Sequence, residues 1–286
     1  MGILKYMIIW KLEWKHSKDL LRRLGWSMVK GAAMNPSRVE VPMGQFVKMN
    51  ILIWNCRGAL NPDFKRRVFE MVVNHCPSIT VITETRVGGS RAEKIIEALP
   101  FDGFITTETI GYAGGLWILW RSEDAEVNLL SAIEQEIHAT IKVCASNLSW
   151  LFTVIYASPR LAEWGILWSN IEKVGQLHNL PWLMIGDFNE ILGGEDKFGR
   201  NQINLNKALE FKECLDSCNF VDLGFAGPKY TWSNKMQISE RLDRCFSNPI
   251  WRILYPEAVV THLPRTFSDH HPVLIELWKP NANSLD

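Results

Sequence analysis

Polar side chains suited to metal binding or proton transfer recur directly after apolar runs in this chain of 286 residues. Six such segments lie in this order: Ile-Trp-Asn-Cys-Arg-Gly (53–58), Thr-Glu-Thr (83–85), Ile-Tyr-Ala-Ser-Pro (155–159), Ile-Gly-Asp-Phe-Asn (185–189), Arg-Leu-Asp-Arg (241–244) and Ser-Asp-His-His-Pro (268–272). Asn, Glu, Tyr, Asp and His side chains at strand ends are the groups that metal-assisted phosphodiester hydrolysis requires. No segment carries this interpretation alone, because it depends on the order and spacing of all six.

The segment at 185–189 places an acid and an amide after a strongly apolar strand. Asp187 and Asn189 are two residues apart, so an extended chain would direct both side chains to one side. Together they can align a water molecule or hold a metal ion with a phosphoryl oxygen. The alternative is an Asx-turn, in which both side chains bond only the local backbone. The segment by itself leaves these two interpretations evenly balanced.

The segment at 268–272 contains two adjacent histidines before an apolar strand. A histidine whose second ring nitrogen is held by a carboxylate can donate a hydrogen bond to a phosphate oxygen. Asp269 is adjacent in sequence and therefore poorly placed to orient His270, whereas Asp243 is the better candidate. His270 and His271 cannot easily face one site on an extended chain, so we expect one of them to be spare. The alternative is a polar loop that leads into the next strand.

Asn55 and Glu84 each follow a predicted strand and precede a loop that contains arginine. A carboxylate and an amide at neighbouring strand ends form a reasonable site for a hard metal ion. Magnesium keeps several waters and takes only one or two protein carboxylates, so a single acid here suffices. Tyr156 ends another strand, where its hydroxyl could bond a phosphate oxygen. The alternative for Tyr156 is an ordinary aromatic residue at a strand end.

Strands and helices alternate from Met49 onward, which predicts the elements that must position these side chains. Strands are predicted at 50–55, 79–83, 114–120, 126–131, 138–143, 150–156, 181–186, 230–233, 242–247, 258–263 and 273–277. Helices are predicted at 65–75, 91–99, 161–177 and 206–218. We expect 114–120 to pair with 126–131, and 138–143 to pair with 150–156. These elements indicate an α+β fold, a four-layer α/β-sandwich in which two mixed sheets pack face to face and are flanked by helices.

The composition is that of an ordinary globular protein, with 47% hydrophobic residues. Thirty-one basic and 31 acidic residues give a formal net charge of zero, which disfavours a pure DNA-binding module and requires any phosphate-binding face to be local. None of the six cysteines forms a Cys-x-x-Cys pair, which argues against a zinc site and favours reduced thiols.

The two ends of the chain differ from the domain that we predict at 49–279. Residues 1–48 include a basic stretch without clear periodicity after it, and we expect a poorly ordered appendage there, with a polar tail at 280–286. The N-terminal apolar stretch is too short for a membrane span and lacks the cleavage site of a signal peptide. We therefore expect a soluble protein that is not secreted and does not bind a membrane.

The six segments together resemble the endonuclease/exonuclease/phosphatase superfamily, the fold of DNase I, exonuclease III and apurinic/apyrimidinic endonucleases. The resemblance extends from about residue 49 to residue 278 and covers every segment in order. Three segments are similar to the endonuclease domains of plant LINE-type (non-LTR) retrotransposons: Gly-Gly-Leu-Trp-Ile-Leu-Trp (114–120), Lys-Tyr-Thr-Trp-Ser-Asn (229–234) and Ser-Asp-His-His-Pro (268–272). One departure is Thr83, which stands where the superfamily commonly has Gln, and it puts a supporting hydrogen bond in question but not the metal ligand.

The resemblance implies a role for each residue by its position. It implies Mg²⁺, which Mn²⁺ can replace, bound by Glu84 with Asp269 as a second ligand and Asn55 holding the geometry. It implies that Asp187 aligns or deprotonates the attacking water, and that Asn189, Tyr156 and His270 contact the phosphate. Asp243 would orient His270. The residues expected to bind the substrate are Arg57, Thr231 and Trp232.

The implied function is a Mg²⁺-dependent DNA endonuclease that nicks one strand and leaves a 3′-hydroxyl and a 5′-phosphate. The 286 residues contain no reverse transcriptase region, so we expect an isolated, retrotransposon-derived module. The first alternative is a phosphatase of the same superfamily that acts on phosphoinositide or nucleotide phosphates. The second is an inactive nucleic-acid-binding remnant, which the intact acids and the zero net charge disfavour. We expect a monomer with DNA as its partner and no protein partner, and a DNA substrate favours the nucleus.

Overall fold

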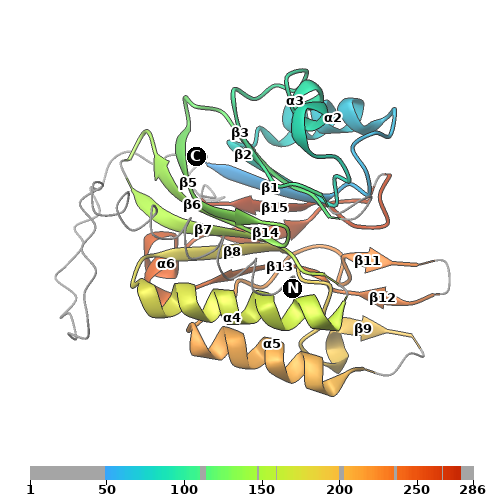
Figure 1. Cartoon of the computed structure of the whole chain (residues 1–286), viewed down its shortest axis with the longest axis vertical. Helices are drawn as coiled ribbons and strands as arrows, with labels where there is room; N and C mark the ends of the chain where they lie inside the picture. The colour runs from blue at the N-terminus through green and yellow to red at the C-terminus, as the bar shows by residue number, and fades with distance from the viewer. Residues whose placement is uncertain are drawn as a thin grey trace, which may run out of the picture.

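The computed structural model describes residues 49–109, 114–146, 148–158, 160–199, 203–234, 237–265 and 267–277. In this part of the chain two six-stranded sheets pack face to face, and helices cover their outer faces (Figure 1). The expected four-layer α/β-sandwich is therefore confirmed. The appendage predicted at 1–48 and the tail predicted at 280–286 lie outside the described residues.

The first sheet has the strand order β14-β15-β1-β2-β4-β3. Its strands are β14 (Val259–His262), β15 (Val273–Glu276), β1 (Asn50–Asn55), β2 (Ile79–Thr83), β4 (Leu116–Trp120) and β3 (Gly103–Thr106). Strands β1 and β2 run parallel with Asn55 opposite Thr83, and the other pairs are antiparallel. Because β1 and β2 end together, Asn55 and Glu84 emerge at the same edge of the sheet.

The second sheet has the strand order β10-β13-β8-β7-β6-β5. Its strands are β10 (Val221–Asp222), β13 (Asp243–Ser247), β8 (Trp182–Asp187), β7 (Ser149–Tyr156), β6 (Glu136–Val143) and β5 (Ala125–Ile133). Strands β7 and β8 run parallel and place Tyr156 opposite Asp187. Strand β13 runs antiparallel to β8 and begins at Asp243, also opposite Asp187. Three of the predicted site residues thus meet at one end of this sheet.

Helices flank both sheets, and their bounds are α2 (Phe64–His75), α3 (Gly89–Ile96), α4 (Leu161–Leu177) and α5 (Leu205–Ser217). α2 and α3 lie on the outer face of the first sheet, whereas α4 and α5 lie on that of the second (Figure 1). Alternate residues of β1 point to opposite faces, so Ile51 and Ile53 enter the core between the sheets while Leu52 and Trp54 belong to the core under α2. Because both faces are covered, β1 is an unbroken buried run.

A third, three-stranded sheet projects from one end of the sandwich (Figure 1). It consists of β11 (Trp232–Ser233), β12 (Ser239–Glu240) and β9 (Lys197–Phe198). Trp232 forms a backbone bridge to His270, and β12 ends three residues before Asp243. The small sheet therefore adjoins the end of the molecule where the predicted site residues lie.

The predicted pairing of 114–120 with 126–131 is wrong. β4 pairs with β2 and β3 in the first sheet, whereas β5 pairs with β6 in the second. The apolar pattern identifies both strands, but the short connection between them passes from one sheet to the other. The other predicted pair, β6 with β7, is confirmed, and the turn residue Asn147 lies outside the described residues.

Several short elements carry no recognisable sequence pattern. The strand predicted at 230–233 is restricted to the two residues of β11, and β9, β10 and β12 also have two residues each, too few to show alternation. Strand β3 and helix α6 (Pro249–Leu254) are likewise not indicated by periodicity. In the part of the chain that the structure describes, no helix has the length and hydropathy of a membrane span.

Candidate active site

Asn55 joins the ends of the two sheets. Its side-chain nitrogen Nδ2 donates to Glu84 Oε2 at 3.0 Å and to Asp187 Oδ2 at 2.8 Å. An amide nitrogen carries two hydrogens, so these two carboxylates use both of them. His270 Nε2 lies 3.4 Å from the same nitrogen. One fully buried amide thus brings together an acid from each sheet and the histidine.

Asp243 holds His270 in place. His270 Nδ1 lies 2.8 Å from Asp243 Oδ2, and His270 Nε2 lies 3.9 Å from Asp187 Oδ2. Ser268 Oγ also accepts a hydrogen bond from the backbone N–H of His270 at 3.1 Å. His271 instead directs Nδ1 to the carbonyl oxygen of Leu263. The structure therefore turns only the first of the two histidines toward the acids.

Burial and mutual charge shift the protonation of this cluster. Desolvation and the nearby charge of Asp243 raise the pKa of Asp187, the charge of His270 and two hydrogen bonds lower it, and the net result is a pKa of about 6. Burial lowers the pKa of His270, but the charges of Asp243 and Asp187 outweigh that effect and raise it to about 9. Near neutral pH His270 is therefore protonated and Asp187 is ionised.

Two arginines surround Glu84. Arg86 donates through Nε to Glu84 Oε1 at 3.1 Å and forms a second contact through Nη2. Arg57 Nε lies 3.5 Å from Glu84 Oε2, and its Nη1 reaches Asp269 Oδ2 at 2.9 Å. Arg57 thus connects two of the predicted metal ligands. Arg86 is not among the predicted site residues, although its position two residues after Glu84 is a usable signal for side chains that meet.

Left-handed backbone is concentrated in this site. Seven non-glycine residues of the described chain have positive φ, and four of them are Arg57 (53°), Glu84 (53°), Arg86 (57°) and Asn189 (47°). Such a conformation costs about 1–3 kcal/mol per residue and persists only where surrounding contacts enforce it. The sheets therefore hold these side chains in directions that a regular strand end would not give them.

Two glycines make the close approach of these segments possible. A Cβ atom on Gly186 would lie 2.0 Å from the carbonyl oxygen of Ile155, and its φ is 144°. A Cβ atom on Gly115 would lie 2.2 Å from Thr85 Oγ1. The Gly114 and Gly115 carbonyls accept the backbone N–H groups of Arg86 and Thr85. Gly186 allows β8 to pack closely against β7, next to Asp187. Gly114 and Gly115 accept the hydrogen bonds that fix the turn after Glu84.

Asp187 and Asn189 form the turn that was the alternative interpretation of this segment, but both side chains also make hydrogen bonds to residues far away in sequence. The backbone N–H of Asn189 donates to Asp187 Oδ1 at 3.0 Å, whereas its side chain donates to the Ala157 carbonyl at 2.7 Å. The chain is not extended here, so the argument that both side chains point to one side is wrong. Tyr156 is partly buried; burial raises the pKa of its hydroxyl, and the charges of Glu84 and Asp187 raise it further.

The predicted substrate-binding residues occupy three different environments. Arg57 is half exposed, and Trp232 is partly exposed and donates through Nε1 to Asp269 Oδ2 at 2.9 Å. Thr231 is fully buried. Its hydroxyl accepts the backbone N–H groups of Leu242 and Asp243, each at 2.9 Å. Thr231 therefore has no surface for DNA and instead fixes the start of β13, on which Asp243 lies.

The oxygen donors at this end of the molecule suit a hard divalent cation. Glu84 and Asp269 are held within reach of one guanidinium, which shows that the two carboxylates share a cationic environment. Asp187, Asp243 and His270 also offer ligand atoms within 4.8 Å of one another. In that group, however, the 2.8 Å contact of His270 with Asp243 is a hydrogen bond, which already occupies one ligand atom of each residue.

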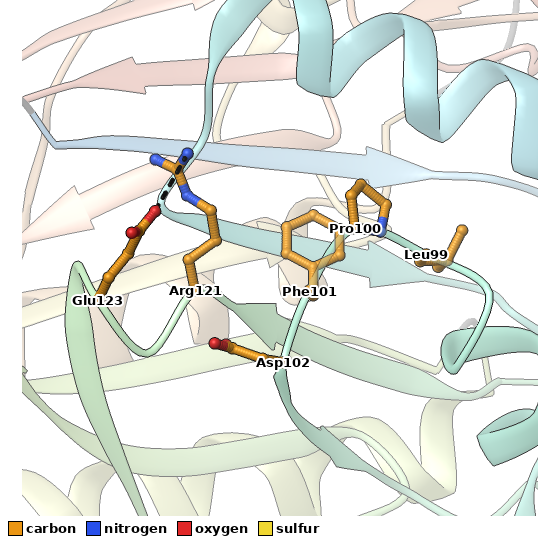
Figure 2. Close-up of a pocket in the computed structure, with 6 residues that line it drawn as sticks. All are labelled: Leu99, Pro100, Phe101, Asp102, Arg121 and Glu123. Carbon is orange, nitrogen blue, oxygen red and sulfur yellow. Dashed lines mark ion pairs between the residues drawn. The ribbon is translucent and has the colours of Figure 1, made fainter.

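A separate hollow of about 420 Å³ lies at the other end of the first sheet (Figure 2). It is lined by Leu99, Pro100, Phe101, Asp102, Arg121 and Glu123. Arg121 follows Trp120, which pairs with the first residue of β2, whereas Glu84 follows the last. Five strand residues span roughly 16 Å, so this hollow is not part of the cluster around Asn55.

The match of the chain to a known family decides its classification. The family model described as endonuclease/exonuclease/phosphatase family matches residues 52–270, which include every residue of the cluster. The chain belongs to this family. Members of the endonuclease/exonuclease/phosphatase family are hydrolases that act on phosphoester bonds and generally depend on divalent metal. No curated protein sequence matches the chain.

Solved structures of this family share the fold. The AP endonuclease LMAP from Leishmania major has a TM-score of 0.67 at 14% identity, over 89% of this chain and 92% of that one. An AP endonuclease from Archaeoglobus fulgidus has a TM-score of 0.62 at 15% identity, over 79% and 98%. The endonuclease domain of TRAS1, a telomere-specific non-LTR retrotransposon, has a TM-score of 0.56 at 13% identity, over 80% and 98%. These similarities establish the architecture of the chain.

Proposed function

We propose that this member of the endonuclease/exonuclease/phosphatase family is a divalent-metal-dependent DNA endonuclease that nicks one strand and leaves a 3′-hydroxyl and a 5′-phosphate. The observation that carries the proposal is the continuous series of buried contacts from Glu84 through Asn55 to Asp187, and from His270 to Asp243. The series links a metal ligand, a base and an acid across both sheets.

Asp187 is the proposed base. Its Oδ2 accepts from Asn55 and its Oδ1 accepts from the backbone of Asn189, so the carboxylate is fixed in direction. With a pKa of about 6 it is ionised at neutral pH yet retains enough basicity to align and deprotonate a water. The water then attacks phosphorus in line with the departing 3′ oxygen.

His270 is the proposed donor to the phosphoryl oxygen. Asp243 holds Nδ1, which leaves Nε2–H directed toward Asp187 and Asn55, where the phosphate would lie. A protonated imidazole there stabilises the negative charge that develops on oxygen in the transition state. Tyr156 and Asn189 lie at the ends of β7 and β8 beside Asp187 and are proposed as further donors to the phosphate.

Glu84 and Asp269 are the proposed ligands of Mg²⁺, for which Mn²⁺ can substitute, and Asn55 keeps Glu84 in place. When bound, the cation supplies positive charge that offsets the charge on the phosphoryl oxygens. Arg57 and Arg86 contact the same Glu84 carboxylate, so a bound cation would share it with these two guanidinium groups.

DNA is the proposed substrate because the small sheet with Trp232 and the half-exposed Arg57 extend the site beyond a single phosphate. The segments similar to plant LINE-type retrotransposon endonucleases include Gly115 and Trp232, which belong to the site or adjoin it. The fold shared with the TRAS1 endonuclease domain supports a retrotransposon-derived module. We propose a monomer that acts on nuclear DNA.

The chemistry of the product tests the proposal. The full chain is incubated with supercoiled plasmid and Mg²⁺, and the open-circular product is treated with DNA ligase. Sealing by ligase is expected, because ligase requires a 3′-hydroxyl next to a 5′-phosphate. Release of inorganic phosphate from nucleotides or phosphoinositide headgroups without nicking would instead establish a phosphatase. Binding of DNA without either reaction would establish an inactive remnant.

A further inference from the structure

Phe267 is an exposed aromatic residue at the edge of the candidate active site. Half of its surface, 51%, is open to solvent, although it lies only three residues before His270. Three residues of chain span at most about 11 Å between Cα atoms. A phenylalanine ring exposed this close to the catalytic cluster has an energetic cost in the free protein, because its apolar surface remains in water.

The side chains of Arg265 and Ser268, on either side of Phe267, make hydrogen bonds. Arg265 donates to Ser233 Oγ and, at 3.3 Å, to the carbonyl oxygen of Asp269. Ser268 Oγ accepts the backbone N–H of His270. Phe267 is therefore presented from a segment that is tied to β11 on one side and to His270 on the other.

Helix α2 supplies a cationic support for the ring. The guanidinium carbon of Arg67 lies 3.9 Å from the centroid of Phe267, and that of Arg66 lies 5.8 Å away. Both distances are within the range of a cation–π interaction. Arg67 is held by Glu70 at 2.6 Å and Arg66 by Asp63 at 2.6 Å. The Arg66–Asp63 pair is exposed, and surface ion pairs of this kind contribute about 0–1 kcal/mol, so Arg66 can exchange its acid for a DNA phosphate at little cost.

α2 begins at the active-site end of the first sheet. Its first residue, Phe64, follows Asn55 by nine positions, and the Phe64 ring stacks on Trp54 at a centroid distance of 6.0 Å. Arg66 and Arg67 lie in the first turn of the helix. An exposed aromatic ring that is interleaved with arginines is the combination that binds single-stranded nucleic acid by base stacking and charge.

We propose, on the basis of the proposed endonuclease function, that Phe267 with Arg67 forms a stacking site for one nucleobase of the DNA strand that is cut. Bases rise by 3.4 Å along each strand, so a reach of about 11 Å places this base within about three nucleotides of the cleaved bond. A base that stacks on protein must leave the duplex stack, so DNA with an unpaired base at that position is the preferred substrate.

The first experiment measures binding to a fluorescein-labelled single-stranded oligonucleotide by anisotropy, in EDTA so that no cleavage occurs. Phe267→Ala is expected to weaken binding by about 5- to 150-fold, the range for loss of one stacked base, whereas Phe267→Trp retains it. Phe69→Ala is the matched control, since Phe69 is 43% exposed on the outward side of the same helix that carries Arg67. Equal affinities for Phe267→Ala and Phe69→Ala would overturn the proposal.

The second experiment locates the stacked base by removing bases from the DNA one at a time. A series of duplexes, each with one abasic position near the nicking site, is assayed for kcat/KM with the wild-type chain and with Phe267→Ala. One position is expected at which removal of the base slows the wild type but not the variant. If the effects of the missing base and of Phe267→Ala simply add at every position, the stacking site is ruled out but the proposed endonuclease function is not. A wild-type chain that neither binds nor nicks DNA would overturn the proposed function as well.

Discussion

His270 Nδ1 lies 2.8 Å from Asp243 Oδ2 across 27 residues of sequence, and both side chains are buried. The adjacent Asp269 carboxylate instead contacts Arg57 and Trp232. Asp243 on the second sheet therefore sets the orientation and the charge of His270, which precedes β15 of the first sheet. The packing of the two sheets is thus a condition for the site to exist.

Replacing Asp243 by Asn is expected to lower the pKa of His270 from its value of about 9, because the charge of Asp243 is the largest contribution that raises it. The measurement is an NMR titration of the His270 ring in the metal-free protein. His271→Gln serves as the control and assigns the His271 resonance among those of the seven histidines. An unchanged pKa in Asp243→Asn would contradict the assigned pairing.

The stability of the folded protein should depend on pH through His270. The pKa of His270 in the folded protein, about 9, exceeds its ordinary value of 6.5, so its charge stabilises the fold fully below pH 6.5. This stabilisation is lost as the pH rises through 9. Urea unfolding of the wild type is expected to show that decline, and Asp243→Asn should flatten it. A slope of equal size in both proteins would show that another group is responsible.

The rate of nicking should follow a bell-shaped pH profile. Ionisation of Asp187, whose pKa is about 6, is required for the base, and protonation of His270, whose pKa is about 9, is required for the donor. Because the two groups interact, the two limbs of the pH profile of kcat/KM report apparent pKa values that belong to the pair. A profile that keeps rising to pH 11 would exclude a protonated His270 from the mechanism.

Gly186→Ala should strongly destabilise the protein. The added Cβ would lie 2.0 Å from the Ile155 carbonyl oxygen at a φ of 144°, which combines a steric clash with backbone strain, and a loss of about 3 kcal/mol or more is expected. Gly165→Ala in α4 is the matched control. It has no atom within 4 Å of the new Cβ, and alanine should stabilise that helix by roughly 0.5–1 kcal/mol. Chemical unfolding distinguishes the two substitutions, which should act in opposite directions.

Mg²⁺ should stabilise the wild-type chain against thermal unfolding. A cation present at 100 times its Kd contributes about 2.7 kcal/mol. Glu84→Gln removes one proposed ligand charge and should reduce the shift in Tm, whereas Glu213→Gln, on the exposed side of α5, should leave it unchanged. Equal shifts in all three proteins would place the cation elsewhere.

Much of this architecture follows from local sequence patterns. The strands that end at Asn55, Tyr156 and Asp187 are predicted because their apolar runs are buried on both faces. The choice of Asp243 over Asp269 as the partner of His270 follows from chain geometry. Strand partners do not follow in the same way, since β4 and β5 are adjacent in sequence but belong to different sheets.

Other features depend on contacts that no local pattern contains. The position of Asn55 between two carboxylates arises only when both sheets are assembled. The left-handed backbone of Glu84 and Arg86 belongs to a turn in which the N–H groups of Thr85 and Arg86 donate to the carbonyls of two glycines about 30 residues away in sequence. The sequence around Thr231 suggests a surface residue of a binding loop, but its hydroxyl accepts backbone hydrogen bonds from Leu242 and Asp243 at the start of β13.

The most direct test of the account is Mg²⁺-dependent nicking of supercoiled plasmid by the wild-type chain, Asp187→Ala, His270→Ala and the control Asp216→Asn, an exposed residue of α5. The wild type and the control are expected to produce open-circular DNA with Mg²⁺ and none with EDTA. Each of the two site variants should be slower by at least about 10²- to 10³-fold, with unchanged circular dichroism. Nicking by Asp187→Ala and His270→Ala at the wild-type rate, or no nicking by the folded wild type, would contradict the account.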